Sequence, residues 1–187
     1  MIRSVVTALT LAVLALPAFA QQKLSVGYIA TADSLPIVVA KEKGFFDRQK
    51  LDVTLVRIAL ASNVPSSVMS DSVQIGMGTG PMLLQTADGG LGLVGIGGVS
   101  QITKTSSVIG LVMRNGVKLD SMADLRGKKI GVPGFNSMMH VVFQKWLADR
   151  KVAASQVQMV EAIFPQMADL LKGGTLDGVL VLAPFRG

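Results

Sequence analysis

The stretch Asp124–Arg150, DLRGKKIGVPGFNSMMHVVFQKWLADR, predicts a short helix, a strand, a tight loop and an amphipathic helix, in that order. Lys129 to Val132 (KIGV) is a short apolar run that suits a buried strand, and a Pro-Gly pair ends it. Asn136 and Ser137 each offer a side-chain oxygen to the unpaired amides of the following helix. The stretch therefore predicts free backbone N–H groups at the carboxyl end of a strand, which suit an anion or a polar ligand group. Any doubly wound α/β domain contains such a unit, so a binding role stays open.

The helix in this stretch has one continuous apolar face. Met139, Val142, Phe143, Trp146 and Leu147 follow one another at helical spacing. Trp146 lies on that face, so we interpret it as a core residue rather than as a platform on which a ligand stacks.

The first twenty residues are typical of a cleavable export signal. Arg3 gives the positive start, residues 5–17 are apolar apart from two threonines, and Ala18 to Ala20 form a small-x-small cleavage site. We therefore expect a mature chain that begins at Gln21 and a periplasmic location. The apolar run is too short to span a bilayer comfortably. No cysteine follows the cleavage site, which excludes a lipid anchor at that point.

The charge and length of the mature chain limit its partners and its domain count. Removing Arg3 from the 18 basic residues leaves 17 against 12 acidic residues, a formal charge of +5. These basic residues are scattered and form no stripe with interleaved aromatics, so we expect no nucleic-acid partner. A mild positive field favours anionic ligands, although an ordinary solvated surface explains it equally well. The remaining 167 residues suit one domain or two small lobes.

The amino-terminal half begins as a βαβ unit. Lys23–Ile29 and Asp52–Ile58 read as strands, and a helix with proline in its first turn lies between them. Asp33 or Ser34 is placed to cap that helix. A right-handed crossover and a parallel sheet follow from this order.

A glycine-rich turn follows the next strand. Val73–Met77 is a predicted strand that runs into Gly78–Gly80 and a helix opened by proline. The lysine and hydroxyl of a phosphate loop are absent, so the turn is either a plain turn or a set of amides for a ligand. Further strands are expected over Leu91–Val99, which is rich in glycine, and over Ser106–Arg114.

We place a boundary between two lobes near residues 114–120, which gives a first lobe over 21–114 and a partial second lobe over 115–187. After the Asp124–Arg150 stretch, the elements expected in the second lobe are a strand over Val157–Glu161, a loop over Ile163–Met167, a helix over Gln166–Lys172 and a strand over Gly178–Leu182.

Four segments together resemble a known family. They are GYIATADSLPIVVAKEKGFFDRQKLDVTLV (27–56), SVQIGMGTGPMLLQ (72–85), DLRGKKIGVPGFNS (124–137) and FPQMADLLKGGTLDGVLVLAPF (164–185). Their spacing and order are similar to those of exported substrate-binding proteins of ATP-driven (ABC) importers, in the nitrate, sulfonate, taurine and thiamine-precursor group. No single motif is diagnostic, but the segments cover most of the mature chain.

The resemblance implies an α/β, two-lobed type II periplasmic-binding-protein fold with doubly wound, mostly parallel sheets that close like a hinge on a ligand. It implies a non-enzymatic monomer, without a cofactor, that delivers a small anionic or zwitterionic solute such as a sulfonate, taurine or nitrate to a membrane permease. Carried over position by position, the implied ligand contacts are Thr31, Ser34, Gly78, Thr79, Gly80, Ser100, Asn136 and Ser137.

The sequence departs from the family at two points. Ala183 stands where the family commonly has an acidic residue before proline and phenylalanine, so a ligand contact or a hinge group is in doubt. The chain is also shorter than the family pattern. We therefore expect a truncated second lobe that exposes apolar surface.

Two other function classes remain alternatives. One is a thiamine-pyrimidine-type binding protein or enzyme, but His140 is the one histidine of the chain and there is no cysteine, which disfavours catalysis. The other is an exported sensor that presents its bound ligand to a receptor. Asp33 offers an amine contact for a zwitterion, or simply caps its helix, and we favour the cap.

Overall fold

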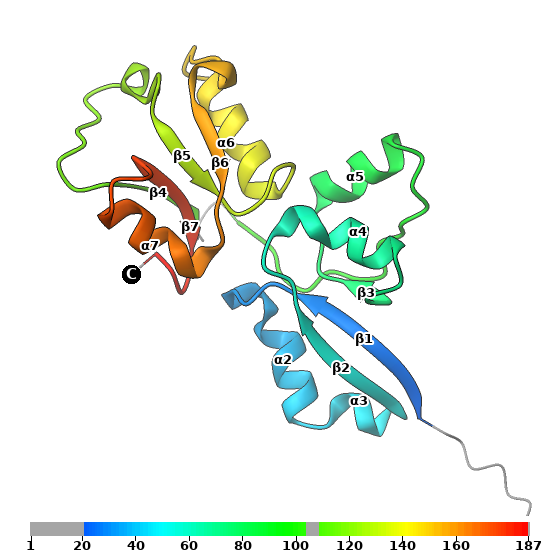
Figure 1. Cartoon of the computed structure of the whole chain (residues 1–187). Helices are drawn as coiled ribbons and strands as arrows, with labels where there is room; N and C mark the ends of the chain where they lie inside the picture. Colours follow the sequence, from blue (N-terminus) through cyan, green and yellow to red (C-terminus); the bar gives the residue numbers. More distant parts are fainter. Residues whose placement is uncertain (1–20, 104–108, 187) are drawn as a thin grey trace, which may run out of the picture.

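The computed structural model describes residues 21–103 and 109–186, which form two α/β halves lying side by side (Figure 1). The predicted export signal and the first residues of the strand expected from Ser106 lie outside the described residues. Within those two ranges no helix is both long and apolar enough to cross a bilayer.

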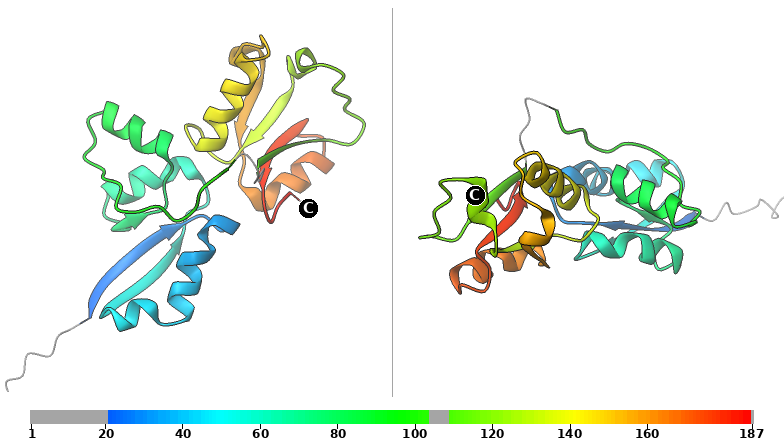
Figure 2. Two further views of the ribbon diagram at one scale, coloured as in Figure 1. Left: turned by 180° about the vertical axis from the view of Figure 1, so that it is seen from behind. Right: turned by 90° about the horizontal axis from the view of Figure 1, so that it is seen from above.

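The first half is built on a parallel sheet with the strand order β2–β1–β3. Its elements are β1 (Gln22–Tyr28), η1 (Ala32–Ser34), α2 (Leu35–Glu42), α3 (Phe45–Arg48), β2 (Leu51–Arg57), η2 (Ala61–Asn63), α4 (Val64–Met69), β3 (Ile75–Gly76) and α5 (Gly80–Asp88). The connections from β1 to β2 and from β2 to β3 run in opposite directions across the sheet. Right-handed crossovers therefore place α2 and α4 on opposite faces (Figure 2).

The second half is built on a sheet with the order β4–β7–β5–β6. Its elements are β4 (Ile109–Met113), η3 (Met122–Leu125), β5 (Lys129–Val132), α6 (Met138–Ala148), η4 (Ala154–Gln156), β6 (Gln158–Glu161), α7 (Phe164–Lys172) and β7 (Gly178–Leu182). The strands β5, β6 and β7 are parallel, and β4 is antiparallel to β7. The helices α6 and α7 cover opposite faces of this sheet (Figures 1 and 2).

The larger hydrophobic core lies in the second half. Ile130 and Val132 of β5 pack with Phe143 and Leu147 of α6, and all four side chains are buried. The predicted apolar face of α6 is confirmed there, except that Val142 is exposed. Burial of these side chains contributes the main favourable term of folding in this half, about 25 cal/mol for each Å² of apolar surface.

Trp146 lies at the edge of this core, half-buried, and its ring stacks on that of Phe143 with 5.8 Å between the ring centroids. The guanidinium carbon of Arg150 lies 4.7 Å from the centroid of the indole. The interpretation of Trp146 as a packing residue is therefore confirmed.

The strand predicted over Leu91–Val99 is wrong. Residues 91–103 have no regular secondary structure, and the side chains of Val94 and Ile96 are 78% and 75% exposed. An extended segment becomes a strand only when a neighbour pairs with its backbone, and the adjacent β3 is two residues long. The glycines of this segment add to the entropic cost of fixing it. Exposed apolar side chains gather in this segment more than in the second half, where we expected them.

Other elements also differ from the prediction, and the strand predicted over Val73–Met77 is reduced to the two residues of β3. The strand β4, which we placed at the end of the first lobe, pairs with β7 and so belongs to the second sheet. The helix α7 begins at Phe164 rather than at Gln166, because proline in its first turn fits a helix start.

Backbone contacts join the two halves at the carboxyl ends of their strands. The Ala61 N–H donates to the Pro133 carbonyl at 3.0 Å, and the Ala32 N–H donates to the Ala183 carbonyl at 3.2 Å. At the first contact the chains approach closely, since a Cβ added to Gly134 would lie 2.7 Å from the backbone nitrogen of Ser62. Glycine at position 134 is therefore a requirement of the junction.

We expect Gly134→Ala to lower the free energy of unfolding by about 1–3 kcal/mol, because backbone atoms cannot move away as a flexible side chain can. Urea denaturation of the variant and the parent measures this difference. Gly92→Ala is the matched control, since a Cβ there meets nothing within 4 Å. Equal unfolding midpoints for the two variants would contradict the close approach.

Candidate functional site

Two cavities lie where the two halves meet, and the larger of these two has a volume of about 480 Å³. This volume is within the range of small-molecule sites, roughly 300–1,000 Å³. The first half contributes residues of η2, α4, α5 and the segment after α5, and the second half contributes the loop after β5 and the end of β6. The lining residues are Ser62, Asn63, Pro65, Met82, Gln85, Thr86, Leu91, Phe135, Asn136 and Glu161.

The loop between β5 and α6 forms one wall of this cavity. The Phe135 N–H donates to Oε1 of Glu161 at 2.6 Å, and the Asn136 N–H donates to Nδ1 of His140 at 3.0 Å. Asn136 has a left-handed backbone with φ of 63°, a conformation that asparagine tolerates better than most residues. The expectation of free amides here is therefore wrong for these two residues, because side chains of the same half accept hydrogen bonds from both N–H groups.

Ser137 caps α6, as the sequence predicts. Its backbone is extended, its side chain is 3% exposed, and Oγ accepts the His140 N–H at 3.4 Å. Asn136 precedes the cap and lines the larger cavity instead. The two polar residues of this loop thus have separate places, one in the helix terminus and one in the cavity wall.

His140 is buried, with 7% of its side chain exposed. Burial lowers the pKa of the imidazole below its usual value of 6.5, and the negative charge of Glu161 opposes that effect only in part. Its Nδ1 accepts an amide proton, and its ring meets Phe135 edge to face with 5.2 Å between the ring centroids. The neutral ring therefore braces the loop.

Thr31 and Ser34 are buried in the turn after β1, and their hydroxyls bond within that turn. The Thr31 hydroxyl contacts the carboxylate of Asp33 and the Ile29 carbonyl, and the Ser34 hydroxyl donates to the Thr31 carbonyl at 2.7 Å. Ser34 takes the cap position of α2 but makes no side-chain cap bond. The prediction that Asp33 or Ser34 caps this helix through its side chain is therefore wrong, because η1 intervenes.

Thr79 occupies the cap position of α5 with an extended backbone. Its Oγ1 is buried and has no hydrogen-bond partner among the described residues. Gly78 and Gly80 on either side are exposed, and Ser100 lies exposed in the irregular segment after α5.

Of the eight residues predicted to contact a ligand, Asn136 lies in the larger cavity. The other seven are not among the described lining residues of either cavity. Glu161 and Gln85 do line the larger cavity and were not predicted. Glu161 directly ends a predicted strand, so the rule that ligands bind at the carboxyl ends of parallel strands would have indicated it. The roles of all eight residues in binding stay predictions.

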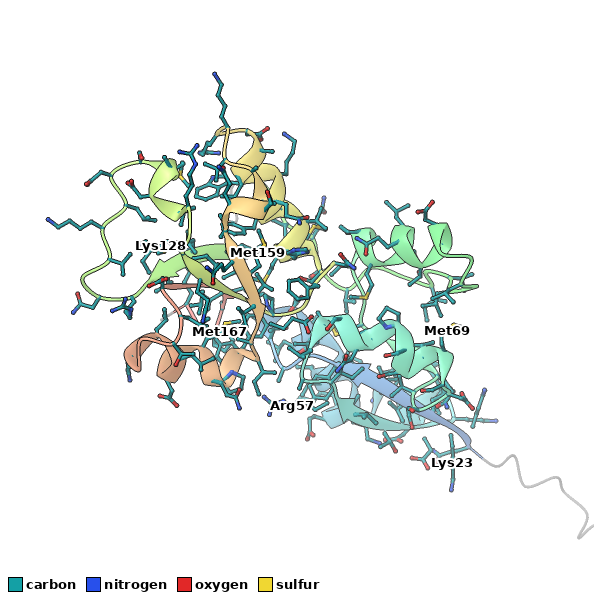
Figure 3. The ribbon with its side chains drawn as sticks, turned by 45° about the horizontal axis from the view of Figure 1, so that its top comes forward. Lys23, Arg57, Met69, Lys128, Met159 and Met167 are labelled. Carbon is teal, nitrogen blue, oxygen red and sulfur yellow. The ribbon has the colours of Figure 1, made fainter. Side chains whose placement is uncertain are left out.

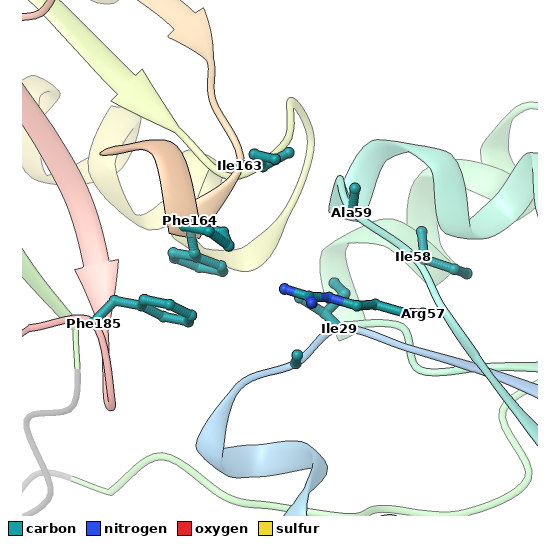
Figure 4. A pocket seen from close by; sticks show the side chains of 9 residues that line it. Ile29, Arg57, Ile58, Ala59, Ile163, Phe164 and Phe185 are labelled. Carbon is teal, nitrogen blue, oxygen red and sulfur yellow. The ribbon is translucent and has the colours of Figure 1, made fainter. Parts of the chain in front are cut away.

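A smaller cavity of about 210 Å³ lies between the sheets beside α7 (Figure 4). Phe164 and Phe185 stack face to face in its wall, with 5.2 Å between ring centroids and 5° between ring planes. The side chain of Arg57, at the end of β2, points toward these rings and lies where the two halves meet (Figures 3 and 4). The lining of this cavity therefore combines two aromatic rings, Phe164 and Phe185, with the guanidinium group of Arg57.

In the part of the chain that the structure describes, no three acidic or histidine side chains are grouped to hold a metal ion. With His140 neutral and occupied at Nδ1, the site offers dipoles, hydroxyls and one carboxylate. Such an arrangement suits reversible capture of a ligand.

Comparison with solved structures gives the class of the fold. The alkanesulfonate-binding protein SsuA from Xanthomonas axonopodis pv. citri, bound to MOPS, matches 90% of this chain and 57% of its own, with a TM-score of 0.74 and 20% identity. The periplasmic nitrate-binding protein NrtA from Synechocystis PCC 6803 matches 88% of this chain and 47% of its own, with a TM-score of 0.68 and 17% identity. The chain therefore has the α/β fold of periplasmic binding proteins, as predicted.

The family model described as NMT1/THI5 like matches residues 31–185, so the chain belongs to the NMT1/THI5-like family. A Haemophilus influenzae protein named for thiamine biosynthesis is 33% identical over 138 residues, which are 69% of this chain and 43% of that protein. The chain spans about half the length of the two solved structures and less than half of this relative. The resemblance to binding proteins of ABC importers is confirmed by these findings.

We expect the stability of the protein to fall as the pH drops from 7.5 to 5.5. With the folded pKa of His140 lowered, the unfolded chain takes up a proton first as the pH falls through 6.5. The neutral ring thus contributes fully to the free energy of unfolding above pH 6.5. Below pH 6.5 this contribution is lost, and the free energy of unfolding falls by at most about 1.4 kcal/mol per pH unit. Thermal melts at a series of pH values measure this.

His140→Asn is the control for this prediction, because its side-chain oxygen keeps an acceptor near the Asn136 N–H but does not titrate. His140 is the one histidine of the chain, so the variant should lose the pH dependence in this interval. An equal slope in parent and variant would show that another group is responsible.

Proposed function

We propose that the chain is the solute-binding component of an ABC importer. It captures a small anionic or zwitterionic solute in the cleft between two lobes and delivers it to a membrane permease. The observation that carries the proposal is the cavity lined by both halves at the carboxyl ends of their strands. That is the place where open α/β sheets bind ligands.

Location and assembly follow from the same proposal. The apolar segment at residues 5–17 and the small-x-small site after it suit export to the periplasm, the location that the name of the nitrate-binding neighbour gives for that protein. We place the two lobes at the two sheets, with β4 in the second lobe, and we propose a monomer.

The proposed solute class rests on two supports. The names of the structural neighbours assign them alkanesulfonate and nitrate, which are both small anions. In this chain, Arg57 supplies a guanidinium in the smaller cavity, and side-chain amides of Asn63, Gln85 and Asn136 line the larger one. Guanidinium and amide N–H groups are donors for oxyanions.

A second candidate is binding of a pyrimidine related to thiamine. It is favoured by the relative named for thiamine biosynthesis, which is the more similar in sequence. The aromatic wall of Phe164 and Phe185 offers a surface on which a flat ring packs. Side-by-side binding measurements with sulfonates, nitrate and aminopyrimidines separate the two candidates.

The proposal predicts that one solute class raises the melting temperature of the protein. At a concentration of about 100 times the dissociation constant, binding adds roughly 2.7 kcal/mol, which shifts the melting temperature of a chain of this size by about 5–10 °C. A panel of sulfonates, taurine, nitrate, bicarbonate and pyrimidines is measured by thermal melts. Melting temperatures that no member of the panel shifts would contradict the proposed function.

Two substitutions test the predicted contacts. We expect Thr79→Val to weaken binding, because the family resemblance places Thr79 among the ligand contacts and its Oγ1 has no hydrogen-bond partner in the described part of the chain. Ser137→Ala should weaken binding and also lower stability by about 1 kcal/mol through loss of the α6 cap.

Isothermal titration with a solute that shifts the melt measures both effects. Thr54→Val and Ser155→Ala make the same chemical changes at exposed positions outside both cavities and serve as controls. Parent-like affinity in both test variants would remove Thr79 and Ser137 from the site.

A further inference from the structure

Among the described residues, the wall of the larger cavity carries one negative charge and no positive charge. Glu161 is the one ionisable residue among the described residues that line it. Its side chain comes from the end of β6 and is partly exposed. A carboxylate in this position repels a bare anion, and the low dielectric of a partly closed cavity strengthens that repulsion.

Hydrogen bonds within the loop after β5 also remove donors from this wall of the cavity, which leaves mainly acceptors there. The N–H groups of Phe135 and Asn136 point to Glu161 and His140, so they are not free to meet an oxyanion. An ionised carboxylate has two oxygens and about four acceptor positions, of which the Phe135 N–H takes one. Glu161 therefore retains most of its capacity to accept hydrogen bonds from a ligand.

The opposite wall of the cavity supplies neutral donors. The hydroxyl oxygen of Ser62 is buried and has no partner among the described residues. Side-chain amides of Asn63 and Gln85 line the same wall. A solute with an ammonium group at one end and an oxyanion at the other matches this pair of walls, with the ammonium on Glu161.

We propose that Glu161 determines specificity by selecting solutes that carry a protonated amine together with an anionic group. The inference rests on the proposed function and narrows its solute class from anions and zwitterions to zwitterions. The charge-assisted bond from an ammonium to Glu161 attracts the right solute, and the same charge excludes a bare anion.

Matched pairs of solutes test this proposal. Taurine and isethionate differ by an ammonium against a hydroxyl group, and β-alanine and 3-hydroxypropanoate differ in the same way. Isothermal titration of the full chain with all four, and with nitrate and methanesulfonate as bare anions, gives the preference for the amine. We expect the amine-bearing member of a pair to bind about 10- to 100-fold more tightly.

Glu161→Gln then isolates the charge. The glutamine oxygen can still accept the Phe135 N–H, so the loop keeps its brace while the carboxylate is lost. We expect this variant to lose the preference for the amine and to bind both members of the pair about equally. Glu42→Gln, at an exposed position on α2, is the matched control and should keep the preference.

The outcomes separate this inference from the proposed function. If hydroxyl members or bare anions bind as tightly as the amines, Glu161 does not select for an amine, while solute capture stands. A preference for amines that persists in Glu161→Gln also overturns the role of Glu161. If no probe binds to the parent, the proposed capture of small anionic or zwitterionic solutes fails, and the inference fails with it.

Discussion

The contact between Gly134 and the Ala61–Ser62 backbone is the constraint on which the arrangement of the two halves depends. A hydrogen bond from Ala61 to the Pro133 carbonyl fixes the end of β5 against η2, and no side chain fits between the two backbones. This contact sets the path of the loop that leads into α6. It therefore decides that residues of η2 and of the β5–α6 loop line the same cavity.

In the β5–α6 loop, backbone N–H groups that hydrogen-bond to side chains of the protein are no longer available to a ligand. A strand followed by a helix is a good anion site when its turn leaves amide groups free. Here Glu161 and His140 take the amides of Phe135 and Asn136, which holds the loop in shape but removes two donors. Ligand recognition at this wall then depends on side chains, whose chemistry is more selective than that of a backbone amide.

Local patterns in the sequence predicted much of the fold. The strands Lys129–Val132 and Gly178–Leu182 have the predicted bounds, because short apolar runs between turn residues mark them locally. The strand expected at Leu91–Val99 failed because a strand also needs a partner, and partners are set by tertiary structure. The family resemblance added the expectation that the two lobes close on a ligand between them, which no local pattern contains.

The candidate site was less predictable for a related reason. Asn136 was predicted and lines the larger cavity, whereas Glu161 appeared in the sequence only as the end of a strand. Its partner, the Phe135 N–H, lies 26 residues away along the chain. Whether an amide is free or bonded depends on such distant side chains, so the loss of the two loop donors could not be inferred from the turn itself.

The central claim is that a solute binds between the two halves, in contact with both. Hydrogen–deuterium exchange, measured with and without the solute that gives the largest thermal shift, tests it most directly. The account predicts slower exchange on binding in two separate segments, residues 61–91 of the first half and residues 135–145 of the second. Protection confined to one half would contradict it.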